Sequence, residues 1–247
     1  MTKRILPLLV IAVGTLLWVS CNKKTEEFVY SEPSRGFYPL GIGHSILYEV
    51  DSTIWNDFNC TKSTRHLQMR YTVADTFTDN SGRPSYRIDV EERANADSNW
   101  LVSQVFYATP TGGGLDVVMQ NVRMTKLIFP IVNGATWFGN RGIDTTDPNL
   151  RQYSGWVYRY SDYLQPYNNG YVNFDNTVTV TSVNDSLNNP ETMPMAYAER
   201  NFMREVYAYD NKGLIYREYT HWTYDPGTAA NACRKGFSVV MRATNFR

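Results

Sequence analysis

Cys21 is the residue whose chemistry the sequence indicates most clearly. A short basic start containing Lys3 and Arg4 precedes an apolar run over residues 5–19, and Ser20 comes directly before the cysteine. A basic segment, an apolar segment and a small residue at the cut are typical of a secretory signal peptide. A cysteine at the first mature position favours a bacterial lipoprotein signal. We therefore predict a signal peptide over residues 1–20 and lipid attachment to the Cys21 thiol.

Two alternatives to this anchor stay open. Plain secretion after ordinary cleavage is disfavoured by the bulky Trp18 three residues before Cys21. An uncleaved membrane helix is disfavoured because the apolar run is shorter than the roughly 20 residues that span a bilayer. Several acyl chains on one cysteine, at about 0.8 kcal/mol for each buried CH₂, would hold a soluble domain durably on a membrane. Asn22 after the cysteine favours the outer membrane, on either its periplasmic or its surface face.

Cys60 and Cys233 are the two cysteines that remain once Cys21 carries lipid. An even pair in an exported chain is compatible with a disulfide, because the compartment outside the cytoplasm is oxidising. Such a bond would join an early strand to the last one. Two unpaired cysteines are the open alternative. Neither residue lies in a Cys-x-x-Cys pair, so zinc binding and thioredoxin-like chemistry have no support.

Catalytic patterns are weak in this sequence. None of the three histidines (His44, His66, His221) belongs to an H-E-x-x-H or H-x-H ligand pair, so we predict no metal and no cofactor. Glu205 and Glu218 could pair as the two carboxylates of a glycosidase. Because each lies beside an arginine in a predicted hairpin, we expect cross-strand salt bridges on a solvated sheet face instead. We therefore predict no catalytic residues.

The net charge argues against a nucleic-acid partner. The whole sequence holds 24 Lys and Arg against 24 Asp and Glu, and the signal peptide removes two of the basic residues. The mature chain is therefore slightly acidic, whereas nucleic-acid binding calls for a basic face. The 18 tyrosines and 6 tryptophans suit β-strands of an exported protein, since tyrosine packs its ring and keeps its hydroxyl wet.

Polar and apolar residues alternate along most of the chain, which predicts strands. The stretches that carry this pattern are residues 44–55, 67–77, 86–93, 100–108, 115–131, 156–161, 177–183, 202–209, 214–222 and 237–243. Asn80–Pro84 and Asp210–Gly213 supply hairpin turns, and Met195–Arg200 is a weak helix candidate. We predict an all-β fold with about nine or ten strands and little helix, an antiparallel meander curved into an open barrel or half-barrel. Residues 21–36 would be a polar tether and residues 37–247 a single β domain.

The sequence also resembles uncharacterised outer-membrane lipoproteins of the Bacteroidetes. The resemblance rests on a Tyr-Pro-Leu-x-x-Gly opening, a Tyr-x-Val-Asp-Ser strand and a Gly-Leu-Ile-Tyr-Arg-Glu segment near the C-terminus. In this chain the matching segments are residues 37–43, 48–53, 126–130, 137–140, 205–208 and 213–222. The resemblance implies an outer-membrane location and a β-rich fold, and it supplies no activity.

Three tripeptides resemble the Asp-Ser/Thr-x signal for O-glycosylation in that phylum. Their acceptor residues would be Ser52, Thr145 and Ser186. The leading functional expectation is a non-enzymatic, lipid-anchored envelope lipoprotein that binds an apolar ligand in a concave sheet. An accessory subunit of an outer-membrane protein complex and an envelope hydrolase with an unrecognised site are the alternatives.

Overall fold

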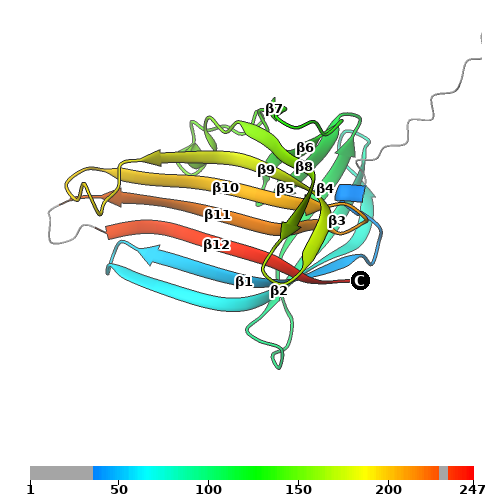
Figure 1. Cartoon of the computed structure of the whole chain (residues 1–247), viewed down its shortest axis with the longest axis horizontal. Helices are drawn as coiled ribbons and strands as arrows, with labels where there is room; N and C mark the ends of the chain where they lie inside the picture. Colours follow the sequence, from blue (N-terminus) through cyan, green and yellow to red (C-terminus); the bar gives the residue numbers. More distant parts are fainter. Residues whose placement is uncertain (1–35, 228–232) are drawn as a thin grey trace, which may run out of the picture. The chain divides into compact units, whose positions relative to one another are not determined.

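The computed structural model describes residues 36–227 and 233–247, and these residues form one antiparallel sheet of 12 strands without an α-helix (Figure 1). The predicted signal peptide and nearly all of the predicted tether lie outside the described residues. The strands are β1 (Ser45–Asn56), β2 (Thr61–Thr78), β3 (Pro84–Arg93), β4 (Leu101–Thr111), β5 (Gly114–Met119), β6 (Val122–Ile128), β7 (Thr136–Trp137), β8 (Tyr158–Asn168), β9 (Asn173–Leu187), β10 (Ala198–Ala208), β11 (Gly213–Asp225) and β12 (Cys233–Phe246). A short 3-10 helix, η2, spans Arg151–Tyr153.

Each strand pairs with its neighbour in sequence, except at the centre and at the two edges of the sheet. The spatial order is β6-β5-β4-β3-β2-β1-β12-β11-β10-β9-β8-β7, so the first and last strands pair in the middle. This arrangement confirms the predicted all-β antiparallel meander. The described residues hold 12 strands, slightly more than the nine or ten that we expected.

The two edge strands approach each other and nearly close the sheet into a barrel. The backbone N–H of Thr125 on β6 donates to the carbonyl of Gly139 at 2.9 Å, and the Trp137 indole donates to the Thr125 carbonyl at 2.8 Å. The Tyr160 hydroxyl accepts from the N–H of Ile128 at 2.8 Å and donates to its carbonyl at 2.9 Å. We call the contact of β6 with residues 137–160 the seam. Side chains make three of the hydrogen bonds given above, where a regular strand pair would use backbone groups alone.

Large aromatic side chains fill the interior of the sheet. Among the fully buried residues the largest are Trp156, Tyr48, Tyr158, Tyr160 and Tyr207. A buried phenol needs a hydrogen-bond partner, and the Tyr48 hydroxyl donates to the carbonyl of Leu214 at 2.8 Å. The expected alternation places one face of most strands in the core, whereas β9, β10 and β11 each contain four consecutive buried residues.

Two hairpins confirm the predicted turns, and a third was not expected. Asp210–Gly213 links β10 to β11, with Asp210 and Asn211 at positive φ, and Asn80–Pro84 links β2 to β3. The predicted continuous strand over residues 115–131 is wrong, because Gln120 and Asn121 turn the chain at φ of 51° and 63°. This left-handed pair contains no glycine, so the usual hairpin signal is missing.

The helix candidate Met195–Arg200 is also wrong. Ala198 begins β10 and is the partner of Tyr224 on β11, while Glu199 pairs with Leu187 on β9. Pairing on both sides satisfies the backbone here, and tertiary context of this kind overrides a weak helix propensity.

The six strands β1, β2 and β9–β12 extend toward the left of Figure 1, where the β1–β2 turn and the β9–β10 connection lie, while the described chain begins at the right. β4, β5 and β6 do not reach into that extension. The concave face of the sheet is therefore covered at one end and less enclosed at the other.

Candidate ligand-binding site

A cavity of about 300 Å³ lies inside the nearly closed sheet. Partners on neighbouring antiparallel strands point to the same side of a sheet. Met203 on β10 is the partner of Tyr219 on β11, and Tyr219 is the partner of Val239 on β12. These three side chains therefore form one row along the cavity wall, and β2, β4, β5 and β6 supply the facing wall.

Methionine is the residue type that distinguishes this cavity. Five of the eight methionines of the chain line it, and they are Met69, Met119, Met124, Met203 and Met241. Methionine is unbranched and polarisable, so it adapts to the shape of an apolar occupant. No aspartate or glutamate is among the described residues that line this space. We call it the methionine cavity.

The residues that line the methionine cavity differ in their exposure to solvent. Met69, Met119, Phe237 and Val239 are half-buried, whereas Met241 is buried. The outer part of the wall is therefore partly exposed to solvent.

A buried group of three charged residues lies at the inner end of the cavity. The Lys126 ammonium donates to Oε2 of Glu205 at 2.9 Å, and the Arg217 guanidinium donates to Oε1 of the same carboxylate at 2.8 Å through both Nε and one terminal nitrogen. The Tyr207 hydroxyl donates to Oε2 at 3.0 Å. The Glu205 side chain is fully buried, and Lys126 and Arg217 expose only 4% and 13% of their side chains. We call Lys126, Glu205 and Arg217 the ionic cluster.

The strand register explains how these residues meet. Glu205 on β10 is the direct partner of Arg217 on β11, so both side chains point inward from one hairpin. Lys126 comes from the seam strand β6, where the register with β5 shifts between Leu115 and Asp116 and leaves Lys126 without a partner. A β-bulge of this kind re-aims side chains. Lys126 therefore reaches across the interior to the opposite wall.

Burial and mutual attraction shift the pKa of all three groups. Burial lowers the pKa of Lys126, against the opposing attraction of Glu205. Burial alone would raise the pKa of Glu205, but the charges of Lys126 and Arg217 hold it well below its usual range. Burial alone would lower the pKa of Arg217, but Glu205 raises it. With all three groups ionised the cluster carries one excess positive charge, and of the two cations it is Lys126 whose pKa is lowered.

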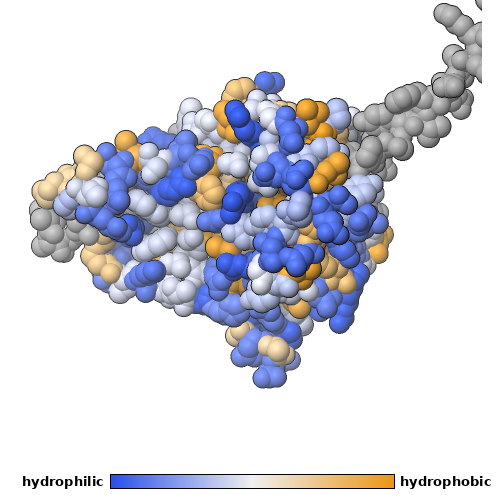
Figure 2. All heavy atoms as spheres, in the orientation of Figure 1, coloured by the Kyte–Doolittle hydropathy of each residue, from blue (hydrophilic) through white to orange (hydrophobic). Residues whose placement is uncertain are grey.

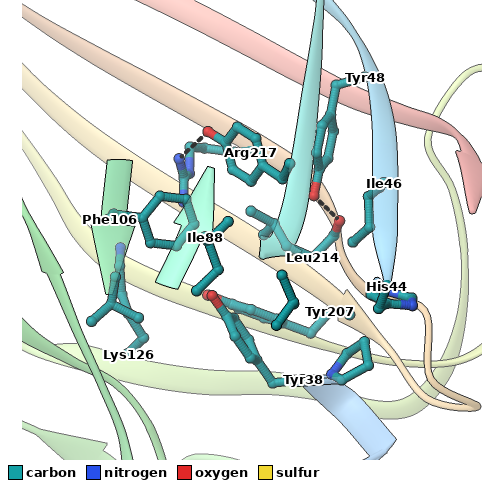
Figure 3. Close-up of a pocket in the computed structure, with 15 residues that line it drawn as sticks. Tyr38, His44, Ile46, Tyr48, Ile88, Phe106, Lys126, Tyr207, Leu214 and Arg217 are labelled. Carbon is teal, nitrogen blue, oxygen red and sulfur yellow. Dashed lines mark hydrogen bonds between the residues drawn. The ribbon is translucent and has the colours of Figure 1, made fainter. Parts of the chain in front are cut away.

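A second, smaller cavity of about 40 Å³ also contacts the ionic cluster (Figure 3). Lys126 and Arg217 line both cavities. In the view of Figure 3, Lys126 and Phe106 lie at the left of the small cavity and His44 lies at the right. Tyr38, from the segment that enters the sheet at this end, covers it from below. Lys126 and Arg217 of the cluster therefore lie between a small, largely aromatic cavity and the larger methionine cavity.

The sequence-predicted cysteines fall into two groups. Cys21, the predicted lipid attachment site, lies outside the described residues. Cys60, at the β1–β2 turn, and Cys233, at the start of β12, form a disulfide with their Cα atoms 5.4 Å apart. The structure thus selects the paired alternative for these two cysteines.

The three predicted glycosylation acceptors differ in accessibility. Ser52 is half-buried on β1, where it is the partner of Val239 and so shares the concave side of the sheet. Thr145 is half-buried in the loop between β7 and η2, and Ser186 is exposed near the end of β9. Their modification stays a prediction.

The prediction that Glu205 and Glu218 form salt bridges on a solvated sheet face is right for Glu218 and wrong for Glu205. Glu218 pairs with Arg204 at 3.2 Å on the partly exposed face, as expected. Glu205 is instead fully buried in the ionic cluster. Because Glu205 faces inward and Glu218 outward, the two carboxylates do not face one another across a cleft. The hairpin pattern correctly predicted the two salt bridges, but the sequence did not indicate which face of the hairpin lies inside the sheet.

The histidines lie apart from one another. His44 lines the small cavity, and burial lowers its pKa. His66 on β2 is exposed and bonded through Nδ1 to Asp51 at 2.9 Å, a contact that raises its pKa. His221 on β11 is half-buried, and burial lowers its pKa. Over residues 36–227 and 233–247 there is no cluster of three or more His, Cys, Asp or Glu side chains that could hold a metal ion.

Sequence reasoning did not identify Lys126 or the methionines as site residues. Lys126 stands next to the apolar run of residues 127–129, and a lysine inside an apolar strand is a usable signal, because lysine is almost never fully buried unless it is paired. The methionines are spread from residue 69 to residue 241, so only the closed sheet gathers them.

Comparison with known proteins gives no relative from which a role could be transferred. A scan against protein-family models and a search of curated proteins found no match to this chain.

Proposed function

We propose that this protein is a lipid-anchored envelope lipoprotein that holds an apolar ligand and performs no catalysis. The methionine cavity is the observation that carries the proposal. Ligand sites are concave and mostly apolar, with a few polar groups that fix orientation. A wall of methionines with Lys126 and Arg217 at its inner end has this composition.

The anchor and its location rest on the sequence. A signal-like segment ending at Cys21, and the resemblance to outer-membrane lipoproteins of the Bacteroidetes, support lipid attachment and an outer-membrane location. Within the described part of the chain no helix is long and apolar enough to cross a membrane. The lipid on Cys21 would be the contact with the membrane.

Native mass spectrometry of the protein extracted from its own envelope in mild detergent tests both parts. We expect added mass from acyl chains on Cys21 and a further, dissociable mass from a small apolar molecule. A chain without acyl mass would overturn the anchor, and a lipidated chain that never carries a second small molecule would overturn the binding function.

A pair of variants locates the ligand. Val239→Trp adds an indole to the cavity wall, whereas Val240→Trp adds the same group on the opposite face of β12, at a position that is likewise half-buried. We expect Val239→Trp to abolish the dissociable mass and Val240→Trp to retain it. Equal retention in both variants would place the ligand elsewhere.

A second candidate is an accessory subunit of an outer-membrane protein complex. The turns at the extended end of the sheet expose large apolar side chains, and pale orange residues lie at that end, at the left of Figure 2, among hydrophilic ones. Phe58 is 95% exposed at the β1–β2 turn, and Met195 is 70% exposed between β9 and β10. Exposed apolar surface of this kind favours a protein contact. A stoichiometric second polypeptide in the same mass spectrum, lost in Phe58→Ser, would support this candidate.

A further inference from the structure

We infer that the ligand of the methionine cavity is an amphiphile with a single acidic group, and that its anionic head binds the Lys126 ammonium at the inner end of the cavity. This inference rests on the proposed binding function and adds the chemical class of the ligand. Its apolar part would lie along the methionines, between the ionic cluster and the half-exposed outer wall.

The charge balance of the ionic cluster is the first argument. Two cations, Lys126 and Arg217, share one carboxylate, Glu205. Removing charges from water is costly unless each is paired, so an uncompensated buried cation calls for an anion. The described lining of the methionine cavity contains no aspartate or glutamate that could supply it.

The hydrogen-bonding state of Lys126 is the second argument. A lysine ammonium has three N–H donors. Among the described residues Lys126 donates one side-chain hydrogen bond, to Glu205. Arg217, by comparison, donates to Glu205 twice and lies 3.4 Å from the Tyr71 hydroxyl. Arg217 also donates to the Met241 Sδ at 3.9 Å, so its bonds among the described residues use four of its five N–H donors, whereas Lys126 uses one of three. Lys126 is therefore the cation with more donors left for a ligand.

The position of Lys126 is the third argument. Its side chain lines both interior cavities, so it stands at the point where an apolar chain entering from the outer wall would end. An anion placed there would oppose the effect of burial on the Lys126 pKa. A ligand that arrives as the neutral acid could hand its proton to an unprotonated lysine, which yields the same ion pair.

Binding of a matched pair of probes tests this inference. Decanoate and decan-1-ol share an apolar chain and differ in the head group. We would titrate each into the full chain purified in a non-ionic detergent at one fixed concentration, so that partition into micelles is equal for all variants. A charge-assisted hydrogen bond is stronger than a neutral one, and the difference raises affinity about tenfold. We expect decanoate to bind at least about tenfold more tightly than the alcohol does, after correction for micelle partition.

Lys126→Met removes the cation while keeping an unbranched side chain of similar length. We expect it to weaken decanoate binding about tenfold or more and to leave decan-1-ol binding unchanged. Lys62→Met, which removes an exposed lysine of β2 remote from the cavity lining, is the matched control and should change neither. Lys126→Gln serves as a second cavity variant should the methionine variant fail to fold.

Carbon-13 labelling of the decanoate carboxyl adds a readout that a purely structural role of Lys126 would not move. The carboxyl should stay ionised to lower pH when bound to the unsubstituted chain than in the micelle, and Lys126→Met should remove this difference. Equal binding of acid and alcohol, or equal weakening of both by Lys126→Met, would overturn the inference and leave the apolar binding function standing. Failure of both probes to bind the unsubstituted chain would overturn the two together.

Discussion

Removal of the single acid of the ionic cluster should cost far more stability than removal of one of its two cations. Glu205 accepts hydrogen bonds from Lys126, Tyr207 and Arg217, and its side chain is fully buried. Glu205→Gln would leave two buried cations facing a neutral amide. Breaking a buried pair in this way costs about 3–5 kcal/mol. Lys126→Met leaves the Glu205–Arg217 pair intact and removes the excess charge, so we expect a change within about 1 kcal/mol in either direction.

Urea unfolding followed by tryptophan fluorescence measures this difference. With an m-value near the upper end of about 1–3 kcal/mol/M, Glu205→Gln should lower the midpoint by about 1–2 M and Lys126→Met should barely move it. Glu218→Gln is the matched control, because it makes the same change on the partly exposed face of the same hairpin. Its pair with Arg204 should contribute less than about 1 kcal/mol. Equal losses in Glu205→Gln and Lys126→Met would refute the charge balance on which the reasoning rests.

Three further changes test other parts of the fold. Serine at both Cys60 and Cys233, 173 residues apart, should lower the free energy of unfolding by about 5 kcal/mol on the chain-entropy model, and reduction of the unsubstituted chain should give the same urea midpoint. Burial raises the pKa of Tyr48 and Tyr207 well above 10, so the stability these phenols contribute is complete below pH 10 and falls above it by up to about 1.4 kcal/mol per pH unit for each, measurable as urea midpoints between pH 9 and 11. Gly139→Ala would place a methyl group 2.7 Å from the Thr125 carbonyl, and thermal unfolding should show a loss of about 1–3 kcal/mol, whereas an unchanged melting temperature would mean that the seam is loose there.

The sequence allowed local structure to be predicted far better than the site. Asp210–Gly213 is a strong hairpin signal because aspartate, asparagine and glycine tolerate positive φ, and the turn is where it was expected. Gln120 and Asn121 adopt the same left-handed conformation without a glycine, so their residue types did not predict the β5–β6 turn. Local turn chemistry is readable from neighbours in sequence only where the residue types are the favoured ones.

The ionic cluster could not be predicted because it depends on closure of the sheet. The Glu205–Arg217 pair follows from the hairpin register and was expected as a salt bridge. Which face of that hairpin lies inside is decided by the curvature of all 12 strands. Lys126 lies 79 residues from Glu205 in the sequence, and the two meet only because β6 closes against the opposite edge of the sheet.

Two roles for Lys126 remain distinguishable on physical grounds. As a closure device it would tie the seam strand β6 to β10, whereas as a ligand contact it would supply positive charge to the cavity. Apolar side chains of the same volume usually stabilise a fold as well as a buried ion pair does, so closure alone gives little reason for a lysine at this position. Amide hydrogen exchange separates the roles in the ligand-free protein. Faster exchange at Thr125 and Ile128 in Lys126→Met would assign the lysine to the seam. Unchanged exchange there, together with lost decanoate affinity, would mean that the buried charge is kept for the ligand.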